Sequence, residues 1–498
     1  MIRVHAAEPA SWVATPGVAA TPAVSSADEL PLCVHLDGAV VRTDVGTETL
    51  IVLLKRNMLC AFLALLWLCR GRAFFKDQVA RRSVLRPEYL PYNLELVDWL
   101  RSERRRGRSI WLCTGTNEKL AEPIATHLGL FDGVIASDWN TNLGRAALAR
   151  RLVAVFGHRQ FDYCGSRRDD VPAWRNAHAS VVVRASRAVE QKASRLAPLL
   201  QTFPRRISRS RALARALRPH QWAKNVLVFA PLLAAHRFAD VGGLFNASLA
   251  FVAFCLCASS VYLINDMVDL EADRTHPHKS GRPFATGDLP VSVGLKVVPL
   301  LLIGAALIST QLRLEFAATL GAYCLLSFAY SLGVKGVMLL DTVVLAALYT
   351  SRVIAGGLAT ETPTSFWMLL FSIFLFLSLA FVKRYAELDA LRRSHKVAPE
   401  GRSYNVNDLP ILESLGTGAG YMSVVVLALY INSPVVQTLY RRPEYIWAVC
   451  VLLLYWIARI WMKAHRGRMD EDPVLFALQD RVSLGIALVC AVALGLAI

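Results

Sequence analysis

The stretch FVAFCLCASSVYLINDMVDLEAD, residues 251–273, decides the fold of this chain and the place of its chemistry. It is a long apolar run that ends in Asn265, Asp269 and Asp273, spaced four apart. Residues at positions i, i+4 and i+8 share one face of a helix. The pattern therefore predicts a buried or lipid-facing helix that carries an amide and two carboxylates near one end. Acidic residues at such a place are costly and usually functional.

Oxygen ligands at this spacing suit Mg²⁺, which keeps several waters and is completed by the phosphates of a substrate. We therefore expect Asn265, Asp269 and Asp273 to bind Mg²⁺ and to act in catalysis. The loop that follows is basic, and its Lys279 and Arg282 are expected to hold the same diphosphate. The alternative interpretation is a solvated, capped helix end.

Composition divides the chain into two unlike halves. The 498 residues are 54% hydrophobic and carry a net charge of +17, a combination that is unusual for a soluble protein. Residues 1–218 are rich in Arg, whereas residues 219–498 are a succession of apolar runs, as in a polytopic membrane protein. The length criterion predicts about nine transmembrane helices, the first of them short and either kinked at Pro231 or only half-crossing. The expected spans are 222–236, 245–265, 291–311, 315–332, 338–358, 365–383, 413–432, 445–463 and 482–498.

The distribution of Lys and Arg predicts the orientation in the membrane. One set of loops carries most of these residues, whereas the opposite loops carry only Arg237, Arg313, Arg441 and Arg442. Positively charged loops stay in the cytoplasm. We therefore expect a multi-pass protein of the bacterial inner (plasma) membrane, with the N-terminal half and the acidic motif on the cytoplasmic side. We expect the lipid bilayer as a partner and no nucleic acid, and the sequence leaves the oligomeric state open.

The N-terminal half predicts an α/β domain. Residues 1–28 are rich in Ala, Pro and Ser and predict a disordered segment without a secretory signal. From 29 to 200, short apolar runs alternate with helical patterns, which indicates a Rossmann-like parallel sheet. Residues 201–218 form a basic linker to the membrane domain of residues 219–498. The expected strands are Leu32–Leu36, Ser109–Thr114, Val134–Ser137, Phe161–Gly165 and Ser180–Arg184, and the expected helices lie near 117–129 and 143–157.

A helical insertion at 47–106 interrupts this alternation. Its apolar run Leu59–Cys69 is too short to span a bilayer. It is either a cap on the sheet or a helix in the membrane surface, because Lys55, Arg56 and other basic residues flank it. The ten cysteines are scattered without a CxxC pair and indicate small apolar fillers in a reducing compartment.

The stretch PLCVHLDGAVVRTD, residues 31–44, resembles the first motif of haloacid dehalogenase-type phosphatases. In that family two aspartates flank one residue, and the first is the nucleophile. Here His35 takes the first position and Asp37 the second. A phosphoaspartate mechanism needs the carboxylate nucleophile. The resemblance therefore implies a degenerate domain, expected to be inactive as a phosphatase.

The later motifs of that family are only partly present. Thr114 matches the phosphate-binding Thr, and Asp170 in GSRRDDVPAW, residues 165–174, matches the last acidic motif. Ser166 replaces the first Asp of that motif, and Gly144 or Arg145 stands where a lysine is expected. A structural or phosphate-sensing role is the favoured interpretation of the domain.

From Leu217 to the C-terminus the chain resembles the UbiA superfamily of intramembrane transferases. The acidic motif is shared across that superfamily. The loop Lys383–Asp389 departs from the second Asp-x-x-x-Asp motif of the aromatic prenyltransferases and is most similar to the branch of decaprenyl-phosphate phosphoribosyltransferases. That branch often carries a degenerate phosphatase-like domain in front. The matching pieces are LRPHQWAKN (217–225), NDMVDLEAD (265–273), HKSGRPFATG (278–287), YSLGVKGVMLLD (330–341), RVIAGG (352–357) and KRYAEL (383–388).

The resemblance implies a set of substrate-binding residues. Mg²⁺ on the acidic motif would neutralise a leaving diphosphate, helped by Lys279, Arg282, Lys383 and Arg384. Asp266 is a weaker candidate, a quarter turn off the face.

Other polar residues of the membrane half have two interpretations each. Lys224 and Asn225 reach a lipid phosphate or snorkel. Lys335 binds substrate or pairs with Asp341. Arg352, about 16 Å along its helix from Asp341 at 1.5 Å per residue, pairs with Glu387 or a backbone carbonyl, or acts near the site, which we favour. Tyr330 and Tyr385 hydrogen-bond the substrate or pack at the interface.

These residues predict a Mg²⁺-dependent transferase that moves 5-phosphoribose from phosphoribosyl diphosphate to a polyprenyl phosphate. The alternative is a prenyltransferase that moves a polyprenyl group from its diphosphate to an aromatic or other small acceptor. A transporter is disfavoured because the acidic motif has no second copy. An active phosphatase fused to a transferase is disfavoured by His35.

Overall fold

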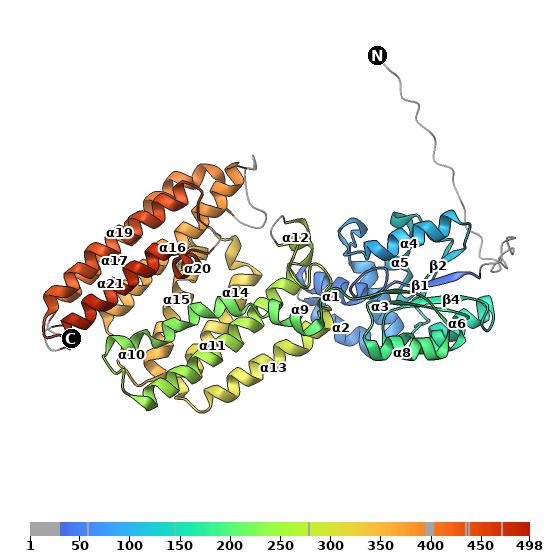
Figure 1. The fold of residues 1–498 in the computed structure, drawn as a ribbon, viewed down its shortest axis with the longest axis horizontal. Helices are drawn as coiled ribbons and strands as arrows, with labels where there is room; N and C mark the ends of the chain where they lie inside the picture. The colour runs from blue at the N-terminus through green and yellow to red at the C-terminus, as the bar shows by residue number, and fades with distance from the viewer. Residues whose placement is uncertain are drawn as a thin grey trace, which may run out of the picture.

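The protein consists of an α/β domain followed by a helical membrane domain (Figure 1). The computed structural model describes residues 30–56, 59–144, 146–276, 279–393, 403–433, 436, 439–469 and 472–498. The segment 1–28 and Arg145 lie outside these residues. The expected fold class of both domains is confirmed.

The α/β domain is built on a six-stranded parallel sheet in the order β3-β2-β1-β4-β5-β6. This is the doubly wound order, in which the strand order reverses beside β1 and leaves a crevice at the carboxyl ends of the strands. The strands are β1 (Leu32–His35), β2 (Ile110–Asn117), β3 (Gly133–Ser137), β4 (Asp162–Gly165), β5 (Ser180–Val183) and β6 (Leu199–Phe203).

The five expected strands are present, with ends shifted by up to three residues. The sixth, β6, lies across the expected domain boundary at residue 200, so the sheet extends to Phe203. Its residues are mostly exposed, which is why no buried apolar run announces it. The expected basic linker also contains a helix, α9 (Arg209–Ala216).

Helices cover both faces of the sheet and pack on two separate apolar cores. Val34 of β1 lies in one core and Cys33 in the other, because successive side chains of a strand point to opposite faces. The helices of this domain are α1 (Val45–Arg56), α2 (Leu59–Cys69), α3 (Arg72–Arg82), α4 (Leu94–Arg105), α5 (Glu118–Leu128), α6 (Ala146–Phe156), α7 (Val171–Asn176) and α8 (Arg187–Leu196), with short 3₁₀ turns η1 (Pro87–Tyr89) and η2 (Arg168–Asp170).

The expected insertion folds as α1 to α4. In its apolar helix α2, Cys60 and Trp67 pack against Leu53 of α1 and Val79 of α3. The other face of α2 is exposed. The main contacts of α2 therefore lie within the insertion, and several of its large apolar side chains are exposed.

The membrane domain contains seven helices long and apolar enough to cross a bilayer, counted over the described residues, or eight if the bent pair at the C-terminus is one span. Together with the composition and the family resemblance, these helices indicate a multi-pass membrane protein. The helices are α11 (Val241–Val268), α13 (Val291–Ser309), α14 (Leu314–Leu332), α15 (Leu340–Ala359), α16 (Phe366–Arg393), α17 (Leu409–Ile431), which follows η5 (Val406–Asp408), α19 (Ile446–His465), which follows η6 (Pro443–Tyr445), and the pair α20 (Pro473–Gln479) and α21 (Arg481–Ala497), bent by 79°.

The first expected span is not a membrane-crossing helix. Residues 222–236 lie in a 3₁₀ segment η3 (Pro219–Phe229) and a five-residue helix α10 (Ala230–Ala234). The segment instead packs tightly on α15, where the carbonyl oxygen of Val228 leaves no room for a Cβ at Gly356. Among the described residues there are thus seven or eight candidate spans, where about nine were expected.

The two domains meet at the end of the membrane helices that carries the acidic motif (Figure 1). Arg274 forms an ion pair of 2.7 Å with Glu48 of α1, and the pair is largely shielded from solvent. Arg184 at the end of β5 binds Asp288 at 3.0 Å. Gly287, at φ +70°, approaches the front domain so closely that a Cβ there would meet the Cβ of Arg42 at 2.6 Å. The basic loop after the acidic motif is thus wedged between the two domains.

Candidate active site

The acidic motif lies at a break between two helices. Helix α11 ends at Val268, and Asp269 joins it to the short helix α12 (Leu270–Thr275). The hydrogen-bond ladder continues through the break, with Asp269 N donating to Asn265 O at 2.9 Å and Asp273 N to Asp269 O at 2.8 Å. The expected continuous helix is therefore broken at Asp269, but the i, i+4 spacing is kept.

Each carboxylate of the motif is held by cations. Asp269 accepts from Lys335 at 2.9 Å on one oxygen and from Lys55 at 2.8 Å on the other. Arg282 binds both oxygens of Asp273, at 2.9 and 2.7 Å. Lys335, in the turn η4 (Val334–Gly336), therefore pairs with the acidic motif and not with Asp341.

Asp266 belongs to the same cluster and was underrated by its place on the helix. It is buried, and one of its oxygens accepts from Arg282 at 3.1 Å and from Arg218 at 2.5 Å. Its other oxygen is buried without a hydrogen-bond partner. Because an unpaired buried carboxylate oxygen is costly, this atom marks a place where a further positive charge would be accepted.

The environment shifts the pKa values of the two predicted carboxylate ligands in opposite directions. Burial acts to raise the pKa of Asp269, but the hydrogen bonds from Lys55 and Lys335 outweigh it and hold this pKa below its ordinary value. Burial raises the pKa of Asp273 above its ordinary value, although Arg282 and Lys279 act against it. Asp269 is thus the carboxylate kept charged by nearby lysines.

The donor set fits Mg²⁺, which prefers carboxylate and amide oxygens. Asp269 and Asp273 offer carboxylates, half-buried Asn265 precedes them on α11, and the unpartnered oxygen of Asp266 adds negative charge. Across the part of the chain that the structure describes, no three His, Cys, Asp or Glu side chains already converge as a metal site. The cations on these carboxylates would have to move for a metal to be held.

Four expected substrate-binding residues lie in two other polar networks. Arg384 is buried and binds Asp341, Glu387 at 2.5 Å and the Tyr330 hydroxyl at 2.6 Å. Its guanidinium is thus committed to protein groups in this structure. Glu387 pairs with Arg384 and not, as one interpretation had it, with Arg352.

Lys224 and Lys383 surround Asp472, which begins α20. Lys224 binds Asp472 directly. Burial acts to raise the pKa of Asp472, but Lys224 and Lys383 outweigh it and hold the pKa below its ordinary value. Asp472 was not singled out from the sequence, because an acidic residue at a helix start is ordinarily a cap, a role it also fills through Val474 N and Leu475 N.

Arg352 lies deep in the helix bundle, as expected for a charge far along a membrane helix. Its guanidinium donates to Asn225 at 2.8 Å, to the Tyr323 hydroxyl at 3.0 Å and to the carbonyl of Leu348. It also lies 4.7 Å from the ring centre of Tyr323. The pairing with a backbone carbonyl is therefore present. Asn225 is buried against Arg352 and not placed at a lipid head group.

Tyr385 packs away from the other expected site residues. It is buried, its hydroxyl lies 3.0 Å from Nδ1 of His465, and its ring packs edge-on against Trp461. The packing interpretation holds for Tyr385 in this structure. Tyr330, in contrast, contacts the Arg384 network.

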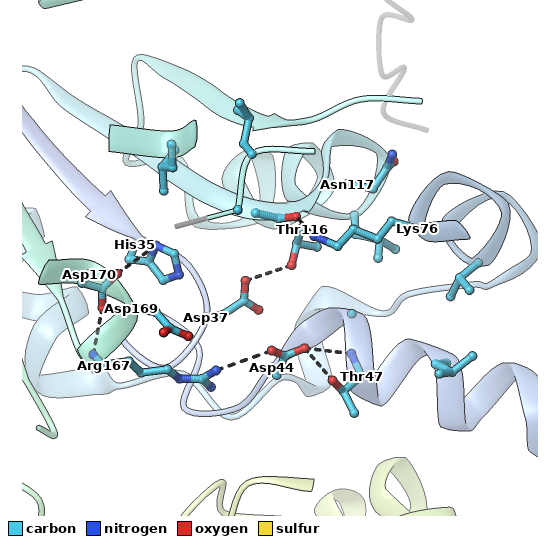
Figure 2. A pocket seen from close by; sticks show the side chains of 18 of the residues that line it. His35, Asp37, Asp44, Thr47, Lys76, Thr116, Asn117, Arg167, Asp169 and Asp170 are labelled. Carbon is cyan, nitrogen blue, oxygen red and sulfur yellow. Dashed lines mark hydrogen bonds and ion pairs between the residues drawn. The ribbon is translucent and has the colours of Figure 1, made fainter. Parts of the chain in front are cut away.

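The front domain has a separate cavity of about 370 Å³ at the carboxyl end of β1 (Figure 2). Asp37 accepts from the hydroxyls of Thr114 at 2.7 Å and Thr116 at 2.9 Å and from Val45 N at 2.8 Å. His35, in the nucleophile position, lies 3.6 Å from Asp170. The predicted motif residues thus meet at one pocket, and Gly144 lines it as well.

Lys76 lines the same pocket, although the sequence motifs did not point to it. It comes from α3 of the insertion, and its ammonium donates to the carbonyl of Gly115 and, at 2.8 Å, to Asn142 in the loop after β3. Burial lowers the pKa of Lys76 below its ordinary value. No local sequence signal could have found it, because 66 residues separate Lys76 from Asn142.

Comparisons with known proteins agree with the division of the chain into two domains. The family model described as "UbiA prenyltransferase family" matches residues 226–493. A Sinorhizobium fredii protein designated y4nM is 32% identical over 460 residues, covering 91% of this chain and 88% of that protein. The decaprenyl-phosphate phosphoribosyltransferase of Mycolicibacterium smegmatis is 40% identical over 214 residues, covering 42% of this chain and 67% of that enzyme.

Solved structures resemble each domain in turn. A UbiA homologue from Archaeoglobus fulgidus bound to GPP and Mg²⁺ is 14% identical, with a TM-score of 0.45, and covers 57% of this chain and 99% of its own. A phosphoserine phosphatase is 11% identical, with a TM-score of 0.26, and covers 36% of this chain and 95% of its own. With an α/β domain in front and the acidic helix motif in its membrane domain, the chain belongs to the UbiA prenyltransferase family.

Proposed function

We propose that the protein transfers 5-phosphoribose from phosphoribosyl diphosphate to a polyprenyl phosphate, in the presence of Mg²⁺, on the cytoplasmic side of a bacterial inner membrane. The observation that carries this choice of substrates is the 40% identity to the mycobacterial enzyme of that activity. The positively charged loops beside the acidic motif support the orientation.

The reaction separates charge and therefore needs neutralisation. An oxygen of the polyprenyl phosphate attacks the anomeric carbon, the bond from that carbon to the diphosphate breaks, and the diphosphate leaves with the electron pair. Mg²⁺, when bound by Asn265, Asp269 and Asp273, supplies positive charge to the leaving diphosphate.

Cations of the protein complete the neutralisation. Arg282 and Lys335 already touch the carboxylates, and Lys279 lies near enough to act on the charge of Asp273. Charge-assisted hydrogen bonds from these groups would hold phosphate oxygens once the carboxylates turn to the metal. Apolar helices around the site exclude water, which favours transfer over hydrolysis.

The second cationic cluster suits the additional phosphate of the proposed substrates. Lys224 and Lys383 both act on the charge of Asp472, so two cations gather at this carboxylate. Phosphoribosyl diphosphate carries a 5-phosphate that a prenyl diphosphate lacks. Arg384, by contrast, is expected to position Glu387 and Tyr330 around this region unless it leaves Asp341 on binding.

The front domain is proposed to lack phosphatase activity. His35 occupies the nucleophile position, and Asp37 spends both oxygens on Thr114, Thr116 and Val45 N. The full-length protein is therefore expected not to hydrolyse p-nitrophenyl phosphate. Hydrolysis that disappears in Asp37→Asn would contradict this proposal.

The deciding experiment uses the purified protein in nanodiscs with labelled phosphoribosyl diphosphate and polyprenyl phosphate. Formation of a labelled lipid that requires Mg²⁺ and stops on addition of a chelator is the expected result. The alternative reaction is tested in parallel with a polyprenyl diphosphate and an aromatic acceptor. Calorimetry that shows tight binding of a prenyl diphosphate analogue and none of phosphoribosyl diphosphate would select the prenyltransferase.

A further inference from the structure

Helix α1 of the front domain ends on the acidic motif of the membrane domain. The ammonium of Lys55, in its last turn, lies 2.8 Å from Asp269 Oδ1 and 3.2 Å from the carbonyl oxygen of Val268. The lysine therefore occupies one oxygen of an expected metal ligand and one carbonyl at the end of α11. Lys55 thus brings a positive charge to this motif from the front domain, 214 residues earlier in the chain.

The position of α1 is fixed along its length. At its start, Val45 N donates to Asp37 in the front pocket at 2.8 Å. One turn later, Glu48 forms the buried pair with Arg274. Ile51 is buried in an apolar cluster with Leu263 and Met267 of α11. These three interactions hold the backbone of α1 in place, so the contact between Lys55 and Asp269 does not depend on the flexible side chain alone.

Lys55 is nevertheless the most exchangeable part of this interface. Its side chain is 46% exposed, whereas those of Arg274 and Glu48 are 11% and 6% exposed. A partly exposed ion pair contributes little to stability. A lysine ammonium on a four-carbon stem can reorient without moving its helix. The interface therefore combines a fixed scaffold with a movable cation at its end.

We propose that Lys55 is a donor-site residue of the transferase, supplied by the front domain. It holds Asp269 when no metal is present and turns to an oxygen of the donor diphosphate when Asp269 binds Mg²⁺. The positive charge near the motif is then kept through both states. This inference rests on the proposed function only in requiring a diphosphate-bearing donor, and it applies to a phosphoribosyl or a prenyl donor alike.

The proposal predicts two effects of opposite sign for Lys55→Ala. Mn²⁺, used as a spectroscopic substitute for Mg²⁺, should bind the full-length variant several-fold more tightly without donor, because the competing ammonium is gone. Inorganic diphosphate should bind about tenfold more weakly in saturating Mg²⁺, because a charge-assisted hydrogen bond is lost. Free Mn²⁺ is measured by electron paramagnetic resonance, and diphosphate by calorimetry. Lys55→Arg should restore diphosphate binding.

Arg86→Ala is the matched control. Arg86 pairs with Glu271 of α12 at 3.1 Å in the same interface without touching Asp269. If it reproduces either effect, loosening of the interface is the cause and the proposal is overturned. Unchanged or weaker Mn²⁺ binding in Lys55→Ala also overturns it. Diphosphate serves as the probe because failure of phosphoribosyl transfer would then leave the role of Lys55 standing.

A different observation carries a second inference, on helix α2. This helix follows α1 closely and exposes Phe62 at 73%, Leu65 at 65% and Leu66 at 63%. Leu63 and Leu68 on the same helix are also exposed. Contiguous exposed apolar side chains of this size mark an interaction surface.

The position of α2 indicates what covers this surface. Helix α1 contacts α11 and α13 at the end of the bundle, so α2 starts beside the membrane boundary (Figure 1). At 11 residues it is about 16 Å long and cannot cross a bilayer. Arg70 and Arg72, both exposed, follow it and complement anionic lipid phosphates. We infer that α2 lies in the cytoplasmic interface of the bilayer that holds the membrane domain.

Photocrosslinking tests this inference in nanodiscs of phosphatidylethanolamine and phosphatidylglycerol. A benzophenone amino acid at position 62 should give lipid adducts, found by mass spectrometry. The same group in place of Arg150, exposed on α6 at the far end of the front domain, should give none. Adducts to a second protein copy at position 62, or equal lipid labelling at both positions, would overturn the assignment.

Discussion

The two domains hold their central carboxylates in different ways. In the front pocket, Asp37 accepts hydrogen bonds from two hydroxyls and a backbone amide, all neutral groups. In the membrane domain, Asp269 and Asp273 are held by Lys55, Lys335 and Arg282, all cations. Both arrangements satisfy a carboxylate, but only in the second are the hydrogen-bond donors themselves charged groups that could turn from the carboxylate to a diphosphate.

This difference separates a structural carboxylate from one available for binding. The donors to Asp37 belong to the sheet and to α1, so Asp37 is suited to hold the start of α1. Lysine and arginine side chains can transfer from a carboxylate to a phosphate oxygen with little change in their charge environment. The membrane site is therefore suited to an exchange of ligands, and the front pocket is suited to hold the fold together.

The largest effect is expected from the carboxylates of the membrane domain. Asp269→Ala or Asp273→Ala should lower transfer at least about a hundredfold, because the charge of the leaving diphosphate is no longer neutralised. The thermal unfolding in detergent should stay near that of wild type. Glu271→Ala, between them in sequence and 43% exposed, is the control and should keep activity. Turnover within a few-fold of wild type in either Asp variant would remove the assignment of the metal ligands.

A large loss of stability is expected from Arg384→Ala. The change leaves the buried Asp341 and its neighbour Glu387 without this guanidinium, and breaking a buried ion pair costs about 3–5 kcal/mol. Thermal unfolding in detergent measures it. Lys383→Ala, one residue earlier, should unfold more like wild type but bind phosphoribosyl diphosphate more weakly. The reverse pattern would show that Arg384, and not Lys383, faces the substrate.

A smaller loss is expected from Asp37→Asn in the front pocket. An amide in place of the carboxylate cannot accept from all three donors, and a buried donor left unsatisfied costs about 1–3 kcal/mol. Hydrogen exchange should rise at the start of α1 and the end of β2. Asp98→Asn, exposed on α4 and paired with Arg101, is the control. Unchanged exchange in Asp37→Asn would show that the hydrogen bonds to Asp37 do not anchor α1.

The smallest effect is expected from Thr116→Val, which removes one hydroxyl from Asp37. The net contribution of one such hydrogen bond is about 0.5–1.5 kcal/mol, so the front domain should be only slightly destabilised. Transfer activity should stay at the wild-type level. A strong loss of transfer without loss of stability would mean that the front pocket takes part in the reaction and is not only structural.

Much of the architecture was predictable because its causes are local. A run of apolar residues long enough to cross a bilayer forms a helix irrespective of its neighbours, and seven such helices are present among the residues described. Alternation of short strands and helices likewise predicted the parallel sheet. The strand β6 was missed because it is mostly exposed and has no buried apolar pattern. The first span was wrong because residues 222–236 pack as η3 and α10 on α15, which the local pattern does not reveal.

The candidate site was predictable in its acidic half and less so in its cations. The spacing of Asn265, Asp269 and Asp273 is readable from one helix. The partner of Asp269 in the front domain is not, because Lys55 lies 214 residues away and is brought there by the docking of two domains. The same holds for Lys76, which comes to the front pocket from the insertion.

The sequence by itself determined the two domains, the membrane helices and the place of the acidic motif, because apolar length and residue spacing act over a few turns of chain. Only the tertiary structure decided which cation holds which carboxylate. It paired Arg384 with Asp341 and Glu387, and Lys335 with Asp269. Ion pairs of this kind form wherever folding brings opposite charges within reach in a medium of low dielectric constant, so their partners follow from the packing of distant elements.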